Sequence, residues 1–234
     1  MIWDLLLSFV PQLVAGLPVT LSILVCSLAI GLVLGALLCW ARMRRAPVIA
    51  QAADFYVLFF RGTPLLVQLF AIYYGLGQFE VVRDSFAWPL LREAWFCAVL
   101  ALGLNSAAFT SEIMRGGIIG VERGQIEAAE AYGFSRLQIA RLVLGPQALR
   151  FALPSYSNET ILMLKGTALA STISIMDLTG IARKLSALHF APFESFIAAG
   201  GIYLVLAMVL TLSYSAIEKR LAWERERKTN VSPV

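Results

Sequence analysis

The chain has 234 residues, of which 59% are hydrophobic and only 15% are charged, with a formal net charge of +4 and a mean hydropathy of +0.76. Soluble domains carry about 25% charged residues, so this composition excludes an ordinary soluble domain, a secreted disulfide scaffold, a nucleic-acid binder and a disordered chain. No polar stretch is long enough to fold separately. We therefore expect one integral membrane domain over residues 1–234, with its three cysteines buried and inert.

Five apolar runs are long enough to cross a membrane as helices, which takes roughly 20 mainly apolar residues. The first run is uncharged and follows an early part broken by Pro11 and Pro18, the second contains Arg61, and the fourth contains Lys165. The sequence predicts an all-α membrane protein with five transmembrane helices, and the predicted spans are 18–40, 55–79, 94–111, 157–176 and 195–217.

The distribution of basic residues predicts the orientation of these spans. Five spans place the two termini on opposite sides, and the cytoplasmic side normally collects Lys and Arg. No Lys or Arg precedes the first span, whereas most of the 19 basic residues lie after the first and third spans and in the C-terminal tail. We therefore expect the N-terminus outside and the C-terminus in the cytoplasm, with the basic tail near anionic membrane lipid and no nucleic-acid partner.

The predicted cytoplasmic loop between the third and fourth spans, residues 112–154, is too long for a simple turn. Residues 127–131 are good helix formers, and Gly133 stands where a glycine ends a helix. Ser135 is placed to cap the helix that follows, and Pro146 disturbs that second helix. A helix, a glycine elbow and a second helix predict a rigid protrusion that can dock into a partner's groove.

This protrusion resembles the EAA loop of ABC-importer permeases. The shared pattern runs, in order, through Glu127, Ala128, Ala129, Gly133, Val143, Gly145 and Pro146. The family has Ile at Val143 and Leu at Gly145, and Gly145 is the larger departure because a glycine loosens the helix before the proline. The resemblance implies that coupling to cytoplasmic ATPases is carried by Glu127, Ala128, Ala129 and Gly133.

Three further segments resemble permeases of polar amino acids, namely RGTPLLVQ (61–68), LNSAAFTSE (104–112) and YSNETILMLKGTAL (156–169). With the loop, they are similar to the M-type permease subunit of histidine/lysine/arginine/ornithine importers and their opine-importing relatives. The resemblance implies the type I ABC-importer permease fold in the bacterial inner membrane. It also implies a second, Q-type permease, a cytoplasmic ABC ATPase dimer that binds ATP and Mg, and a periplasmic amino-acid-binding protein.

The residues of the chain also limit the alternatives. It has no phosphate-binding loop of the form G-x-x-x-x-G-K-[ST], so we expect a transport subunit with neither an ATPase site nor a cofactor of its own. An ATP-independent secondary transporter or channel stays open, but such proteins often show internal repeats and have no use for a docking loop. A membrane-embedded enzyme needs clustered acid–base or metal groups, which scattered carboxylates and the single His189 do not supply.

Polar side chains within the predicted spans are candidates for a substrate pathway, because ionisable groups in lipid cost roughly 2.5–3.5 kcal/mol and usually face a cavity or a partner. Lys165 can meet a substrate carboxylate or pair inside the bundle. Asn105, Gln68 and Thr167 can bind substrate or join neighbouring helices. Glu159 can oppose a cationic substrate or stabilise a helix start. We expect Lys165 and Asn105 to line a polar route between two permeases.

A predicted break in the second span and two acidic residues at span ends are also candidates for a functional or a structural role. The run Gly62-Thr63-Pro64 behind Arg61 predicts a local break that frees backbone carbonyls, which then need polar partners. Glu112 can oppose a cationic substrate or serve helix capping and dipole chemistry. Asp177, at the outer end of the fourth span, can receive substrate or cap a turn.

Overall fold

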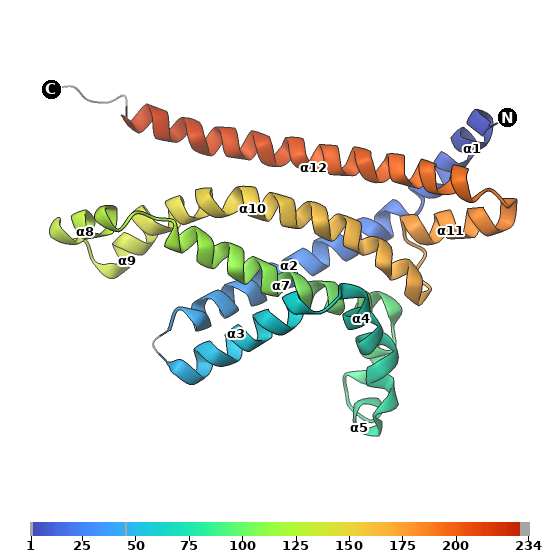
Figure 1. The fold of residues 1–234 in the computed structure, drawn as a ribbon, viewed down its shortest axis with the longest axis horizontal. Coiled ribbons are helices and arrows are strands. Elements are labelled where there is room, and N and C mark those ends of the chain that lie inside the picture. Colours follow the sequence, from blue (N-terminus) through green and yellow to red (C-terminus); the bar gives the residue numbers. More distant parts are fainter. Residues whose placement is uncertain (1, 45, 230–234) are drawn as a thin grey trace.

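The computed structural model describes residues 2–44 and 46–229, with side chains over 8–44 and 46–221. Every regular element within these residues is helical (Figure 1). The bundle is built from α2 (Leu17–Arg42), α7 (Ala94–Ile119), α10 (Gly145–Gly166) and α12 (Pro192–Thr229). In this bundle α2 packs on α7, α7 on α10, and α10 on α12.

Three stretches are long and apolar enough to cross a membrane, namely Ser8–Arg42, Ala94–Ile119 and Pro192–Leu221. Two bent helix pairs also qualify: Pro47–Gly62 with Leu65–Gln78, bent by 105°, and Arg136–Ile173 with Leu178–His189, bent by 50°. The described residues therefore provide three to five candidate spans, in the chain order that the sequence predicts.

The second predicted span is divided by a sharp bend. Helix α3 (Pro47–Gly62) ends at Thr63, whose backbone is extended, and α4 (Leu65–Phe70) begins after Pro64. Proline lacks an N–H group and disfavours helical geometry in the residue before it, so the expected break is confirmed. The helix begins at Pro47, well before residue 55, because its first turns lie on the surface and tolerate polar residues.

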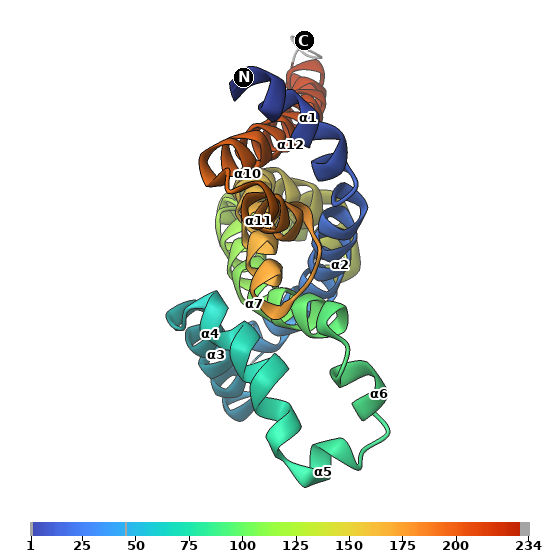
Figure 2. The same ribbon diagram turned by 90° about the vertical axis from the view of Figure 1, so that its right-hand side faces the viewer.

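Beyond α4 the chain makes several short turns before it returns to the bundle. They are η1 (Ala71–Gly75), η2 (Leu76–Gln78), α5 (Glu80–Arg83) and α6 (Trp88–Leu91). Figure 2 shows α5 and α6 projecting away from α10 and α12. The predicted limit of the second span at residue 79 thus falls at the end of an irregular segment rather than of one long helix.

Helix α7 begins at the predicted residue 94 but continues to Ile119, so the first part of the predicted loop 112–154 is helical. Hydropathy alone ends the span at Glu112, but the ion pairs of Glu112 allow the helix to continue through the charged residues. The loop then forms α8 (Arg123–Ala131), α9 (Arg136–Gln138) and the π-helix η3 (Ile139–Leu144). Its last residues belong to α10.

Helix α10 joins the loop directly to the fourth predicted span. A β-carbon on Gly145 would come within 2.8 Å of the Ala140 carbonyl oxygen, so the wide turn of η3 favours glycine where the resembling family has leucine. Pro154, expected to precede the span, lies inside α10. The helix continues through it because packing on both α7 and α12 outweighs the loss of one backbone hydrogen bond.

The predicted span 157–176 is α-helical only to Gly166. The 3-10 helix η4 (Thr167–Ile173) follows, and Asp177 then caps α11 (Leu178–His189). The last predicted span, 195–217, lies within the longer α12.

Two apolar cores hold these helices together. One joins α2, α4, α7, α10 and η4 through buried residues that include Ile23, Leu102 and Leu164. The other joins α1 (Ile2–Val14) to α11 and α12 around Phe9 and Leu178. Cys39 and Cys97 are buried and Cys26 is half-buried, all as free thiols.

Candidate coupling elbow and polar pathway

The turn between α8 and α9 is fixed by local backbone chemistry. Gly133 adopts φ +79°, the left-handed region that a residue without a β-carbon enters at little cost. Its N–H donates to the Glu130 carbonyl (2.9 Å), and the Phe134 N–H donates to the Ala129 carbonyl (3.1 Å). This pair of bonds is the Schellman motif, which satisfies the last carbonyls of a helix. The predicted glycine stop is confirmed.

The second arm of the elbow starts with a capping box. The Gln138 N–H donates to the Ser135 hydroxyl (3.4 Å), and the Ser135 N–H donates to the Gln138 side-chain oxygen (2.8 Å). The predicted cap at Ser135 is therefore confirmed, with a partner that the prediction did not name. The Gln147 amide also donates to Gln125 Oε1 (2.5 Å), which ties α8 to α10.

The elbow presents side chains to its surroundings. Ala129 is buried, whereas Glu127 and Ala128 are exposed. Tyr132 and Leu137, on either side of the turn, are 86% and 65% exposed. In Figure 1 the elbow lies at the same end of the molecule as the C-terminal part of α12, opposite α1 and α11. A rigid turn with exposed apolar side chains suits insertion into a groove.

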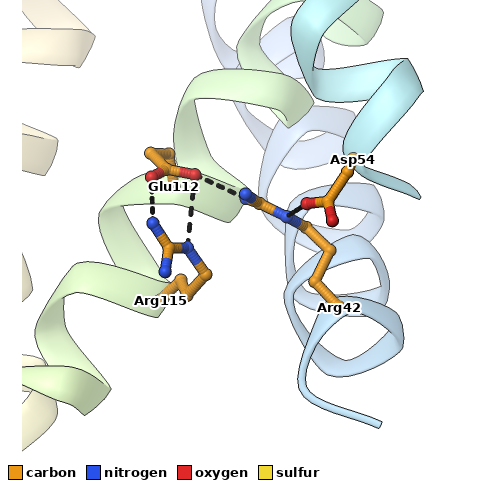
Figure 3. Close-up of polar contacts among 4 residues, drawn as sticks. All are labelled: Arg42, Asp54, Glu112 and Arg115. Atoms are coloured by element: carbon orange, nitrogen blue, oxygen red, sulfur yellow. Dashed lines mark hydrogen bonds and ion pairs between the residues drawn. The ribbon is translucent and has the colours of Figure 1, made fainter. Parts of the chain in front are cut away.

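Four charged side chains meet next to the elbow end of the bundle (Figure 3). Arg42, at the end of α2, donates from Nε to Asp54 of α3 and from Nη1 to Glu112 of α7, each at 2.5 Å. Glu112 also accepts from Nη2 of Arg115, one turn further along α7, at 2.5 Å. The cluster joins three helices, and its two positive charges balance its two negative charges. This geometry favours a structural role for Glu112 over a role opposite a cationic substrate.

The backbone carbonyls freed at the bend between α3 and α4 are bound by two side-chain amides. The Gln68 amide donates to the Phe60 carbonyl (2.9 Å) and to the carbonyl and hydroxyl of Thr63 (3.1 and 2.8 Å). The Asn105 amide of α7 donates to the same Phe60 carbonyl (3.1 Å) and to Gln68 Oε1 (3.0 Å). The predicted need for polar partners at the break is therefore met by two of the pathway candidates.

The three remaining pathway candidates lie on α10 and at its end, in different environments. Glu159 is 4% exposed and lies close to Ser106 of α7. Thr167 is buried and its hydroxyl donates to the Leu164 carbonyl (2.6 Å). Lys165 is exposed on the surface of this chain. The structure therefore does not bring all five predicted residues to one surface, because the two amides and Thr167 are engaged within the chain.

A cleft of about 580 Å³, with both charged and apolar lining residues, lies beside the charged cluster. Arg42, Asp54 and Glu112 line it. Arg61 lines it as well, with its guanidinium 5.3 Å from the centroid of the Phe109 ring. The carboxylate of Asp177 is elsewhere, at the opposite end of the bundle, where it accepts from the N–H groups of Thr179 and Gly180 (3.3 and 2.9 Å). Of the two roles considered for Asp177, receiving substrate or capping a turn, the structure shows the capping role, at the start of α11.

Residues 27–223 match the family of binding-protein-dependent transport system inner membrane components. The chain belongs to this family. It is thus a multi-pass inner-membrane permease, and it is not itself the ATPase of a transport system.

Individual relatives match the permease over almost its whole length. The octopine transport system permease OccM of Rhizobium radiobacter is 49% identical, over 94% of this chain and 89% of its own. The arginine ABC transporter permease ArtM of Haemophilus influenzae is 44% identical, over 93% and 96%. The histidine/lysine/arginine/ornithine permease HisM of Escherichia coli K12 is 43% identical, over 88% and 87%.

Solved structures match the fold of the permease. A chain of an amino acid ABC transporter crystallised with histidines superposes with a TM-score of 0.82 at 34% identity, over 92% of this chain and 96% of that chain. A chain of the inward-facing MetNI methionine ABC transporter superposes with a TM-score of 0.71 at 19% identity, over 92% and 98%, which is a likeness of fold alone. The permease has the type I ABC-importer fold.

Sequence reasoning missed the charged cluster as a unit. Arg42 is one of the basic residues after the first predicted span, which indicate only the orientation of the chain, and Asp54 lies before the predicted second span. The spacing of Glu112 and Arg115 is a helical i, i+3 pair, and this was the one available signal. The contact with Arg42, 70 residues away in the chain, has no signature in one sequence.

Proposed function

We propose that this permease is the M-type subunit of an ATP-driven importer for basic amino acids or opines. The observation that carries the proposal is the similarity, over nearly the whole chain, to permeases of octopine, arginine and histidine/lysine/arginine/ornithine transport. The proposed complex adds a Q-type permease, a periplasmic binding protein and a cytoplasmic ATPase dimer. ATP and Mg bind to that dimer, since the chain has no phosphate-binding loop.

The elbow is the proposed coupling element. Glu127, Ala128 and Ala129 lie on α8, and Gly133 lies in the turn that follows, whose geometry is fixed by backbone hydrogen bonds. A push on α8 would therefore pass to the rest of the permease instead of being absorbed at the turn. The Gln125–Gln147 bond connects α8 to α10, which carries Glu159 and Lys165. Closure of the ATPases would therefore move the bundle as a rigid body.

The proposed polar route runs between this permease and its sibling. A zwitterion that crosses lipid loses its hydration at a large cost, so the route needs charged and polar groups. Lys165 is exposed on this chain and offers a cation to a substrate carboxylate, while the carboxylate of Glu159 offers an anion to a basic side chain. Gln68, Asn105 and Thr167 act as the wall of the route, since their bonds hold the bend and the end of α10 in place.

The test uses the whole complex, reconstituted in liposomes with its binding protein. We expect ATP-dependent uptake of labelled arginine, histidine or octopine, and none of leucine. Gly133→Val forces a branched side chain into the left-handed region, so we expect at least a tenfold loss of uptake with normal membrane insertion. Gly124→Val is the matched control, because Gly124 lies near the start of α8, the helix that ends just before Gly133, and is also in open space but without a positive φ.

The two variants separate coupling from general damage. Equal uptake by the Gly133 and Gly124 variants would refute the coupling role of the elbow. Uptake of the substrates by the isolated permease without ATPase subunits would instead favour the secondary transporter or channel. Substrate-stimulated ATP hydrolysis that persists in the Gly133→Val complex without uptake would locate the loss at the elbow itself.

A further inference from the structure

An apolar groove of about 730 Å³ lies among α2, α7, η3, α10 and α12, outside the polar route. Its walls include Leu32 and Trp40 of α2, Ile118 of α7, and Leu149 of α10. The groove is open to the surroundings along helices that are candidate membrane spans. The rest of the lining is also largely apolar. Its side-chain heteroatoms are the phenol oxygens of Tyr156 and Tyr214, the indole nitrogen of Trp40, and the sulfur atoms of one cysteine and two methionines.

The shape of the groove follows from small side chains. Ala36 and Ala140 line it, and each leaves space that a larger residue would fill. A polar substrate would find no hydrogen-bond partners along most of this surface and would lose its hydration without compensation. Water is also a poor occupant, since apolar cavities of this kind stay dry. A hydrocarbon chain fits the lining.

Positive charge stands at one end of the groove. The Arg44 guanidinium lies 3.8 Å above the centroid of the Trp40 ring, and Trp40 lines the groove. Arg42, two residues earlier, is held by Asp54 and Glu112, whereas no carboxylate within the described residues lies at ion-pair distance from Arg44. This end of α2 lies toward the elbow (Figure 1), on the side of the bundle where most basic residues of the chain occur.

We propose that this groove binds one anionic phospholipid, with an acyl chain along Leu32, Ala36 and Leu149 and the phosphate at Arg44. Aromatic rings are enriched at the membrane interface, and a basic residue beside a hydrocarbon groove recognises an anionic headgroup. The phosphate neutralises Arg44, and the acyl chain covers apolar surface that no helix of this chain covers within the described residues. The proposed lipid site does not include the turn at Gly133 or any of the five residues of the proposed polar route, although η3, in the second arm of the elbow, contributes Ala140 to its wall.

The test is native mass spectrometry of the intact transport complex, titrated with phosphatidylglycerol or with phosphatidylcholine of the same acyl chains. We expect the wild-type complex to bind phosphatidylglycerol more tightly. Arg44→Gln should weaken phosphatidylglycerol about fivefold and leave phosphatidylcholine unchanged. Arg83→Gln, at an exposed arginine on the projecting segment, is the matched control and should change neither.

A second set of variants fills the groove with a larger side chain and measures the effect on lipid affinity. Ala36→Phe should lower the affinity for both lipids at least tenfold, whereas Val33→Phe, on an exposed part of α2 outside the groove, should change neither. If Ala36→Phe does not assemble, Leu149→Trp fills the same groove from α10. Equal affinities for the two lipids, equal effects of Arg44→Gln and Arg83→Gln, or a cross-link from residue 36 to another protein subunit would each overturn the proposal.

Discussion

Replacing Glu112 by Gln removes the charge that joins α2 to α7 while keeping the shape of the side chain. In the wild type, Oε2 accepts from Arg42 and Oε1 accepts from Arg115. Glutamine has one acceptor and one NH₂ group, so one of the two guanidinium groups faces a donor instead of an acceptor. The cluster then holds two arginines and only one carboxylate, that of Asp54.

The loss of unfolding free energy caused by Glu112→Gln depends on how deeply the ion pair is buried. Removing one partner of a buried ion pair costs about 3–5 kcal/mol, whereas exposed pairs contribute about 0–1 kcal/mol. The side chain of Arg42 is 10% exposed and that of Glu112 is 28% exposed, which places the pair between these limits. We therefore expect Glu112→Gln to lower the free energy of unfolding by about 2–3 kcal/mol.

The measurement is equilibrium unfolding of the purified permease in mixed micelles, followed by helical content and tryptophan fluorescence. Glu80→Gln is the matched control, because Glu80 and Arg83 form an exposed pair at 3.8 Å. We expect the control to change the free energy of unfolding by less than about 0.5 kcal/mol. The double variant Arg42→Gln/Glu112→Gln should show a coupling energy of at least about 1 kcal/mol, since the two residues share one bond network.

One outcome would refute this reasoning. If Glu112→Gln costs no more than Glu80→Gln, the four-residue cluster contributes nothing beyond a surface ion pair. High salt separates the two cases as well, because it screens an exposed pair far more than a half-buried one.

The remaining predictions concern the bend, a helix cap and a helix crossing. Asn105→Leu leaves Gln68 Oε1 without its amide donor, so we expect a loss of about 1–3 kcal/mol in unfolding free energy and faster proteolysis near the bend. Asp177→Ala removes the cap of α11 and should cost about 1–2 kcal/mol by the same unfolding assay. Gly35→Ala places a β-carbon 2.8 Å from a Thr110 carbon and should weaken the packing of α2 on α7. The control variant Gly200→Ala, in open space, should be neutral or stabilising. Equal thermal stability of these two variants would contradict the close approach of α2 to α7.

The features that could be predicted are those that arise within a few residues. The elbow follows from Gly133 and Ser135, because a left-handed glycine and a capping hydroxyl act on backbone groups three or four residues away. The bend follows from Pro64, which acts on its own peptide and on the residue before it. Family membership was also indicated, since the EAA spacing and three further segments are local patterns.

The span limits were less predictable for a physical reason. Hydropathy ends a span at the first charged residue, but a charge that is paired by another helix no longer ends it. Helix α7 therefore continues past Glu112 to Ile119. Helix α10 continues through Pro154 for a different long-range reason, its packing on α7 and α12. A single sequence does not say which charges are paired.

The class of protein, the chain order of its spans, the bend and the elbow can all be predicted from the amino-acid sequence, because they depend on composition and on backbone chemistry over short distances. Which polar groups meet depends on the packing of distant helices. Arg42 finds Glu112 across 70 residues, and Asn105 finds Gln68 across 37. In an apolar surrounding each buried polar group needs a partner, and only the packing of α2, α3, α4 and α7 determines which partner is within reach.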